Sequence, residues 1–133
     1  MDRAELEERT KRFALTVIRF VSGMPRTREA DVLGRQLLRA ATSIGANYRE
    51  ANRAESRADF IHKIAIVEKE AAETQYWLDL LLESGLAPQQ KCRETVDEAT
   101  ELLAIFTSVG RTAKRNKSRL PARNSKFEIR NSK

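Results

Sequence analysis

The chain has 133 residues, of which a third are charged and 6% are aromatic, with only five glycines and three prolines. This length and composition predict one helical domain. The single Cys92 excludes an internal disulfide framework and is typical of a reducing compartment, so we expect a cytoplasmic protein. Met1 opens no basic-then-apolar leader, and no apolar run approaches the ~18 to 20 residues of a membrane span. We therefore expect no membrane partner.

The net charge of +6 is unevenly distributed along the chain. Residues 1–110 hold 16 Lys and Arg and 18 Asp and Glu, so this part is near −2. Residues 111–133 hold nine basic residues and one acid, so that segment is near +8. The basicity belongs to the C-terminal segment and not to the body.

The first two predicted helices occupy about residues 2–21 and 28–52. Gly23 and Pro25 end the first one, because glycine suits a C-terminal cap and proline disfavours helix in the residue before it. Apolar residues recur at helical spacing in both segments. The stripes are Leu6, Phe13, Val17, Phe20 and Val21, then Leu33, Leu37, Ala40, Ile44, Tyr48 and Ala51.

The third predicted helix begins after Ser56, which with Asp59 three residues later forms an approximate capping box, and it ends at about Ser84. Pro88 suits the first turn of a fourth helix, which we expect to end within residues 111–118. The third helix has the alternating spacing of a coiled-coil seam. Its seam residues are Phe60, Ile64, Val67, Ala71, Thr74, Leu78 and Leu81.

Four amphipathic helices of ~20 to 29 residues with short connections predict an all-α fold, an antiparallel up-down-up-down four-helix bundle. We place the bundle in residues 1–116 and a disordered basic tail in residues 117–133. The end of the tail repeats Asn-Ser-Lys and has too few apolar residues to bury.

The stretch SIGANYREA, residues 43–51, combines small side chains with polar ones. Small residues let two helix backbones approach closely. Gly45 costs roughly 1 kcal/mol against alanine in a helix interior, so a close contact should compensate. Either another helix of the bundle or another subunit would provide that contact.

Polar residues on the second and third helices have matching spacings. Asn47 and Glu50 lie three residues apart, as do Glu70 and Glu73 beside Trp77, whose indole N–H needs an acceptor. Because buried polar groups must find partners, we expect them to fix helix register and oligomer geometry, with substrate binding as the alternative. The predicted set is Ser43, Asn47, Glu50, Glu70, Glu73 and Trp77.

A basic stripe lies about 200° from the apolar stripe of the second helix, which has no acid between Asp31 and Glu50. An unneutralised basic face is a candidate phosphate-binding surface. Alternatively, acids of the third helix neutralise it across the bundle. The candidate nucleic-acid contacts are Arg35, Arg39, Arg49 and Arg53.

Residues typical of catalysis are scarce. His62 is the only histidine, so Asp59-x-x-His62 cannot supply the two carboxylate-x-x-His pairs of a di-metal bundle. The sequence has no cysteine cluster, zinc spacing or Gly-rich phosphate loop. We expect no enzymatic activity, no metal and no cofactor. A carboxylate-centred site at Glu50, Glu70 and Glu73 is the weaker rival.

Two segments carry a family resemblance: LGRQLLRAATSIGANYREA (residues 33–51) and FIHKIAIVEKEAAETQYWLDLL (residues 60–81). They resemble the four-helix-bundle proteins encoded in intervening sequences of 23S ribosomal RNA genes, a family similar to the accessory variability determinant proteins of diversity-generating retroelements. The resemblance covers about residues 6–109, and departs from the common pattern at Tyr48 and Ala51. It rests on Gln36, Ala40, Ser43, Ile44, Asn47, Glu50, Glu70, Glu73, Trp77 and Leu78.

The resemblance implies an antiparallel bundle that assembles as a homopentameric barrel. In the retroelement relatives, a basic surface binds nucleic acid and partners a reverse transcriptase. We therefore expect a non-catalytic homo-oligomer that binds structured RNA or DNA through the arginines of the second helix. The alternative is a protein-interaction scaffold, for example a reverse transcriptase accessory subunit, without direct nucleic-acid binding. In a pentamer, the small residues of the second helix would permit close contact between subunits, and Asn47 and Glu50 would specify its geometry.

Overall fold

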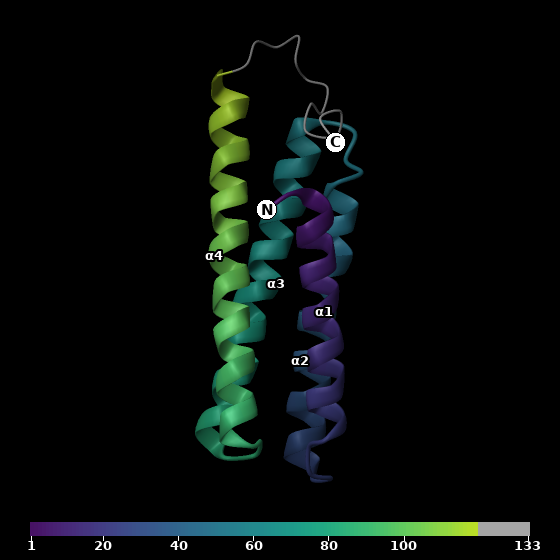
Figure 1. The fold of residues 1–133 in the computed structure, drawn as a ribbon, viewed down its shortest axis with the longest axis vertical. Helices are drawn as coiled ribbons and strands as arrows, with labels where there is room; N and C mark the ends of the chain where they lie inside the picture. Colours follow the sequence, from purple (N-terminus) through teal and green to yellow (C-terminus); the bar gives the residue numbers. More distant parts are fainter. Residues whose placement is uncertain (120–133) are drawn as a thin grey trace.

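The computed structural model describes the backbone of residues 1–119 and the side chains of residues 1–116. These residues form four helices and no strand: α1 (Arg3–Ser22), α2 (Arg28–Ala51), α3 (Arg57–Ser84) and α4 (Gln89–Arg119). Figure 1 shows them running along one long axis as an antiparallel bundle. The predicted fold class is confirmed.

The helix boundaries follow local capping chemistry. Asp2 and Glu5 form a reciprocal capping box at the start of α1, with N–H···O distances of 2.8 and 2.9 Å. Ser56 accepts from the backbone N–H of Asp59 at 3.0 Å, as predicted for α3. Gly85 ends α3 with φ of 75°, a left-handed conformation that glycine adopts without strain. At the other end of the chain, α4 continues through residues 111–118, where we expected it to end, and the predicted tail from residue 120 onward lies outside the described residues.

The core runs along the bundle axis. The seven positions predicted from the seam spacing of α3, six apolar residues and Thr74, are all buried. Tyr48 of α2 packs edge-on against Phe106 of α4, with ring centroids 5.1 Å apart. Burial of its ring and hydroxyl raises the pKa of Tyr48. None of the helices within the described residues has the length and apolar character needed to cross a bilayer.

The close contact predicted for Gly45 is made inside the bundle, with α1. A Cβ atom on Gly45 would lie 3.1 Å from Oγ1 and 3.3 Å from Cβ of Thr10, which is fully buried. Gly34 approaches Val21 of α1 in the same way, with a Cβ-to-Cγ1 distance of 3.2 Å. For Gly45, therefore, the helix that compensates is α1 and not a second subunit.

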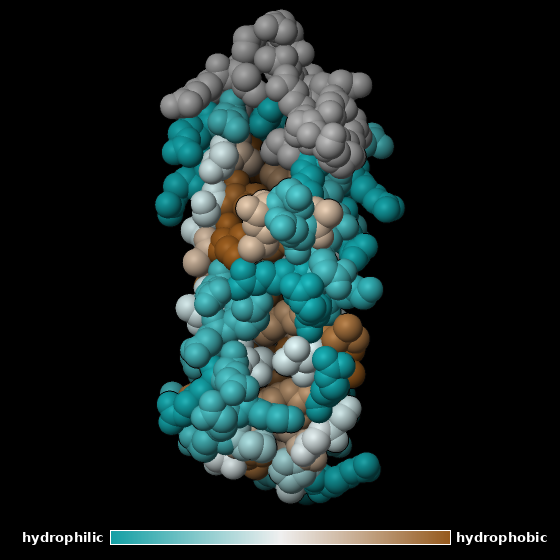
Figure 2. All heavy atoms as spheres, in the orientation of Figure 1, coloured by the Kyte–Doolittle hydropathy of each residue, from teal (hydrophilic) through white to brown (hydrophobic). Residues whose placement is uncertain are grey.

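The seam between α1 and α4 is the loosest in the bundle. Arg9 bridges it: its Nε and Nη2 donate to the two carboxylate oxygens of Glu98 at 2.7 and 2.8 Å, and Nη2 donates to Glu101 at 2.6 Å. These hydrogen bonds and charges raise the pKa of Arg9. In Figure 2, apolar surface between these two helices is crossed at mid-length by a hydrophilic band. A groove of about 420 Å³ adjoins Arg9 between α1 and α4.

Candidate functional site

The predicted polar residues of α2 and α3 lie along one seam between these helices. At one end, Lys63 donates to Glu50 at 2.8 Å, and this ion pair raises the pKa of Lys63. Farther along the seam, Arg39 reaches across to α3. These contacts set the register of the antiparallel helices α2 and α3. Sliding one helix by one residue would displace each pair by about 1.5 Å.

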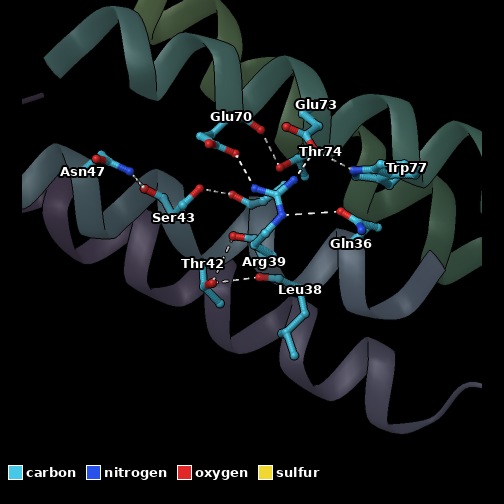
Figure 3. A network of polar contacts seen from close by, with 11 residues as sticks. Gln36, Leu38, Arg39, Thr42, Ser43, Asn47, Glu70, Glu73, Thr74 and Trp77 are labelled. Atoms are coloured by element: carbon cyan, nitrogen blue, oxygen red, sulfur yellow. Dashed lines mark hydrogen bonds and ion pairs between the residues drawn. The ribbon is translucent and has the colours of Figure 1, made fainter. Parts of the chain in front are cut away.

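Arg39 is the centre of a network that joins the two helices (Figure 3). Its guanidinium forms ion pairs with Glu73 and with Glu70, the latter at 3.4 Å. Trp77 donates its indole N–H to Glu73 at 3.1 Å, so one carboxylate oxygen accepts from both groups. The predicted acceptor for the indole is thus found. The Glu70 side chain is largely buried, with an exposure of 14%. The single cation of Arg39 thus faces the carboxylates of both Glu70 and Glu73.

Ser43 and Asn47 satisfy their donors within α2. The Ser43 hydroxyl donates to the carbonyl of Ala40, and the Asn47 amide donates to the carbonyl of Ser43, both at 2.8 Å. Both side chains are half-buried, and neither hydrogen-bonds to α3 within the described residues. They fill the seam without joining the two helices through polar contacts.

Of the three carboxylates of the rival catalytic hypothesis, Glu50 is separated from the other two. Glu50 is held by Lys63, which precedes Glu73 by ten residues, or ~15 Å along α3. Glu70 and Glu73 are bound to Arg39 instead. In the part of the chain that the structure describes, no three His, Cys, Asp or Glu residues form a group suited to a metal ion.

The four arginines of the predicted basic stripe do not form one continuous basic surface. Arg39 pairs with acids of α3, whereas Arg49 pairs with Glu7 of α1 at 3.6 Å. The two arginines therefore extend toward different neighbouring helices. Arg35 and Arg53 are exposed and form no ion pair within residues 1–119. Arg53 lies in the turn after α2, and Arg35 is sixteen residues, or ~24 Å at the helical rise, from the end of α2 at Ala51. Neutralisation by α3 acids, the predicted alternative, therefore applies to Arg39.

Two exposed apolar side chains beside this seam were missed by the sequence reasoning. Tyr76 of α3 is 56% exposed and Val32 of α2 is 47% exposed. Tyr76 packs edge-on against Trp77, with ring centroids 5.2 Å apart. Both residues fall outside the apolar stripes of their helices, which is the signal that could have identified them. They lie toward the N-terminus of α2 and the C-terminus of α3.

The comparisons with known proteins cover most of the bundle. A family model described as 23S rRNA-intervening sequence protein matches residues 3–108. A crystal structure from Bacteroides thetaiotaomicron, described as a protein of unknown function from the S23 ribosomal protein family, is 36% identical to this chain. That alignment has a TM-score of 0.73 and covers 78% of this chain and 96% of the other. No curated protein matches the chain.

Proposed function

The chain belongs to the 23S rRNA-intervening sequence protein family, and from this premise we propose that it is a non-catalytic helical protein that assembles with copies of itself in the cytoplasm. Five copies, as the family resemblance implies, is the proposed stoichiometry. The α2–α3 seam is the proposed contact surface. The polar network around Arg39 would fix how α2 and α3 are placed relative to each other.

One observation supports assembly at this seam above phosphate binding. Arg39, at the centre of the basic stripe, is already neutralised by Glu70 and Glu73, while Tyr76 and Val32 remain exposed beside it. Exposed aromatic side chains are enriched in protein interfaces, and ion pairs satisfied within one chain need no partner. This surface therefore suits contact with protein better than contact with phosphate.

The test is the solution mass of the full chain by light scattering, for the wild type and for Val32→Ser/Tyr76→Ser. The substituted chain should form smaller particles, because both changes remove apolar surface from the proposed contact. The matched control is Leu15→Ser/Ile18→Ser, two α1 side chains with exposures of 40% and 42%, which should keep the wild-type mass. A monomeric wild type, or equal masses for all three chains, contradicts the proposal.

Nucleic-acid binding is the second candidate function, and the exposure of Arg35 and Arg53 without ion pairs within residues 1–119 favours it. Arg35→Gln/Arg53→Gln should weaken binding of structured RNA and lower its dependence on salt, since fewer counterions are released. The control is Lys11→Gln/Arg93→Gln, which changes the net charge equally through two exposed residues. Equal weakening in both chains, or binding that does not change with salt, contradicts this second function.

A further inference from the structure

The groove between α1 and α4 has an apolar floor. Phe13 and Phe20 of α1 form it, each almost fully buried, and Arg9 with Glu98 bounds it on one side. Figure 2 looks onto this face of the bundle, where apolar surface is visible between the two helices. The groove lies along the seam from Arg9 to Phe20, where α1 and α4 meet loosely.

The rim of this groove is positively charged. Arg19 of α1 and Lys91 of α4 are exposed and form no ion pair within residues 1–119. Arg12, also on the rim, has one described ion pair, at 3.7 Å to the exposed Glu8. Two acids line the groove beside four basic side chains: Glu98 is neutralised by Arg9, and Glu94 is exposed. The rim therefore offers cations to an acidic partner.

The exposed apolar residues at the α2–α3 seam have acidic neighbours on α3. Asp79 and Glu83 follow Tyr76 by three and seven residues, so all three lie on the outward face of the helix. Both acids are exposed and form no ion pair within residues 1–119. We call Val32, Tyr76, Asp79 and Glu83 the docking surface. It carries the charge opposite to that of the groove.

The groove and the docking surface lie at the same level along the bundle. Cys92 of α4 donates to the carbonyl of Leu78 of α3 at 3.4 Å, which places Lys91 level with the docking surface. In a four-helix bundle whose neighbours are α1–α2, α2–α3 and α3–α4, the α1–α4 seam lies opposite the α2–α3 seam. Two surfaces at one level on opposite faces allow bundles to stand side by side with parallel axes.

We propose that the docking surface of one copy sits in the α1–α4 groove of the next copy. This inference rests on the proposed self-assembly and identifies the two surfaces that would make it. Tyr76 and Val32 would cover the groove, while Asp79 and Glu83 would face Arg19 and Lys91. Because the two surfaces differ, the contact is head-to-tail, and it closes into a ring when the rotation between copies permits.

The test uses full-length chains with reversed charges on one surface at a time. The groove chain carries Arg19→Glu and Lys91→Glu, and the docking chain carries Asp79→Lys and Glu83→Lys. Each should be a monomer by light scattering, because like charges would meet at every contact. An equimolar mixture should assemble again beyond a dimer, because the wild-type docking surface fits the wild-type groove and the two reversed surfaces have opposite charges as well. A chain with all four substitutions should assemble to the wild-type number of copies.

The control chain carries Lys11→Glu and Arg93→Glu, the same charge change outside both surfaces, and it should keep the wild-type mass. Far-ultraviolet circular dichroism should show equal helix content in every chain, since all substituted residues are exposed. A wild-type oligomer whose mass is unchanged in the groove chain overturns this inference and leaves the proposed assembly standing. A monomeric wild type overturns both.

Discussion

Arg39 was predicted to contact phosphate, but in the structure it holds two helices together. From the sequence it belongs to a basic stripe, but in the structure it joins α2 to Glu70 and Glu73 of α3. The spacing of the two acids indicated a shared face, and their partner could not be derived from it. The partner depends on the rotation of α2 about its own axis, which packing against α1 and α3 sets together.

Arg39→Gln should lower the free energy of unfolding by about 1 kcal/mol, because it leaves Glu70 and Glu73 close together without their cation. The effect stays small since the guanidinium is half exposed to solvent. Urea unfolding measures it, followed by the fluorescence of Trp77, the single tryptophan of the chain. In a double-mutant cycle with Glu73→Gln, the two losses should add up to more than the loss in the combined chain. Strictly additive losses contradict the network.

Tyr48 should make stability depend on pH at the alkaline end. Burial raises its pKa in the folded chain, so above pH 10 the folded state holds a proton that the unfolded state has released. The corresponding stability is complete below pH 10 and is lost as the pH rises through the folded pKa. Denaturant unfolding between pH 8 and pH 11 should show a smaller decline for Tyr48→Phe than for the wild type. Tyr76→Phe, at an exposed position, should decline as the wild type does.

The helices themselves were predictable because the apolar spacing, the capping residues and the terminating residues all indicate the same boundaries. In α3, the seam spacing, the Ser56 cap and the Gly85 terminus all indicate the same helix, and the structure has it at Arg57–Ser84. The end of α4 was less predictable, since a basic segment without a cap carries no stop signal. The open α1–α4 seam was not predictable either, because periodicity shows which face of a helix is buried but not how closely two helices meet.

The contact between α1 and α2 depends on Gly45. Alanine there would gain about 1 kcal/mol of helix propensity, but its Cβ would lie 3.1 Å from Oγ1 of the fully buried Thr10. Thr10 can move only if α1 shifts as a whole, and overpacking of this kind costs about 1 to 3 kcal/mol. We therefore expect Gly45→Ala to lower the free energy of unfolding by about 1 kcal/mol. Adding Thr10→Ala should recover part of that loss in thermal or urea unfolding, and a stabilised single variant contradicts this account.

The contact between α1 and α4 depends on Arg9. Its hydrogen bonds to Glu98 and Glu101 join two neighbouring helices that otherwise meet loosely. Arg9→Gln should lower the free energy of unfolding by about 2 kcal/mol. This value is smaller than the summed energies of the three hydrogen bonds, because water screens the pair with the exposed Glu101. Amide hydrogen exchange should accelerate more in α1 than in α3. Arg12→Gln, whose pair with Glu8 is exposed, should change stability by less than about 0.5 kcal/mol.

At the scale of the whole molecule, ion pairs join neighbouring helices, and oppositely charged surfaces lie on opposite faces of the bundle. Arg39 and Arg9, which join neighbouring helices, form ion pairs with acids of the same chain. Among the residues that remain exposed without ion pairs within residues 1–119, Arg19 and Lys91 lie on one face and the oppositely charged Asp79 and Glu83 on the other. Under the proposed assembly, each chain would gain stability from its neighbours in addition to its own core.

That dependence should appear in thermal unfolding at different protein concentrations. When folding and assembly are coupled, the midpoint rises with concentration, because only the folded chain binds its neighbours. We expect such a rise for the wild type across a hundredfold range of concentration. The Arg19→Glu/Lys91→Glu chain should show one midpoint at all concentrations, close to that of the dilute wild type, because its core is unchanged. A concentration-independent wild type would mean that each bundle is stable alone and that the complementary faces do not associate.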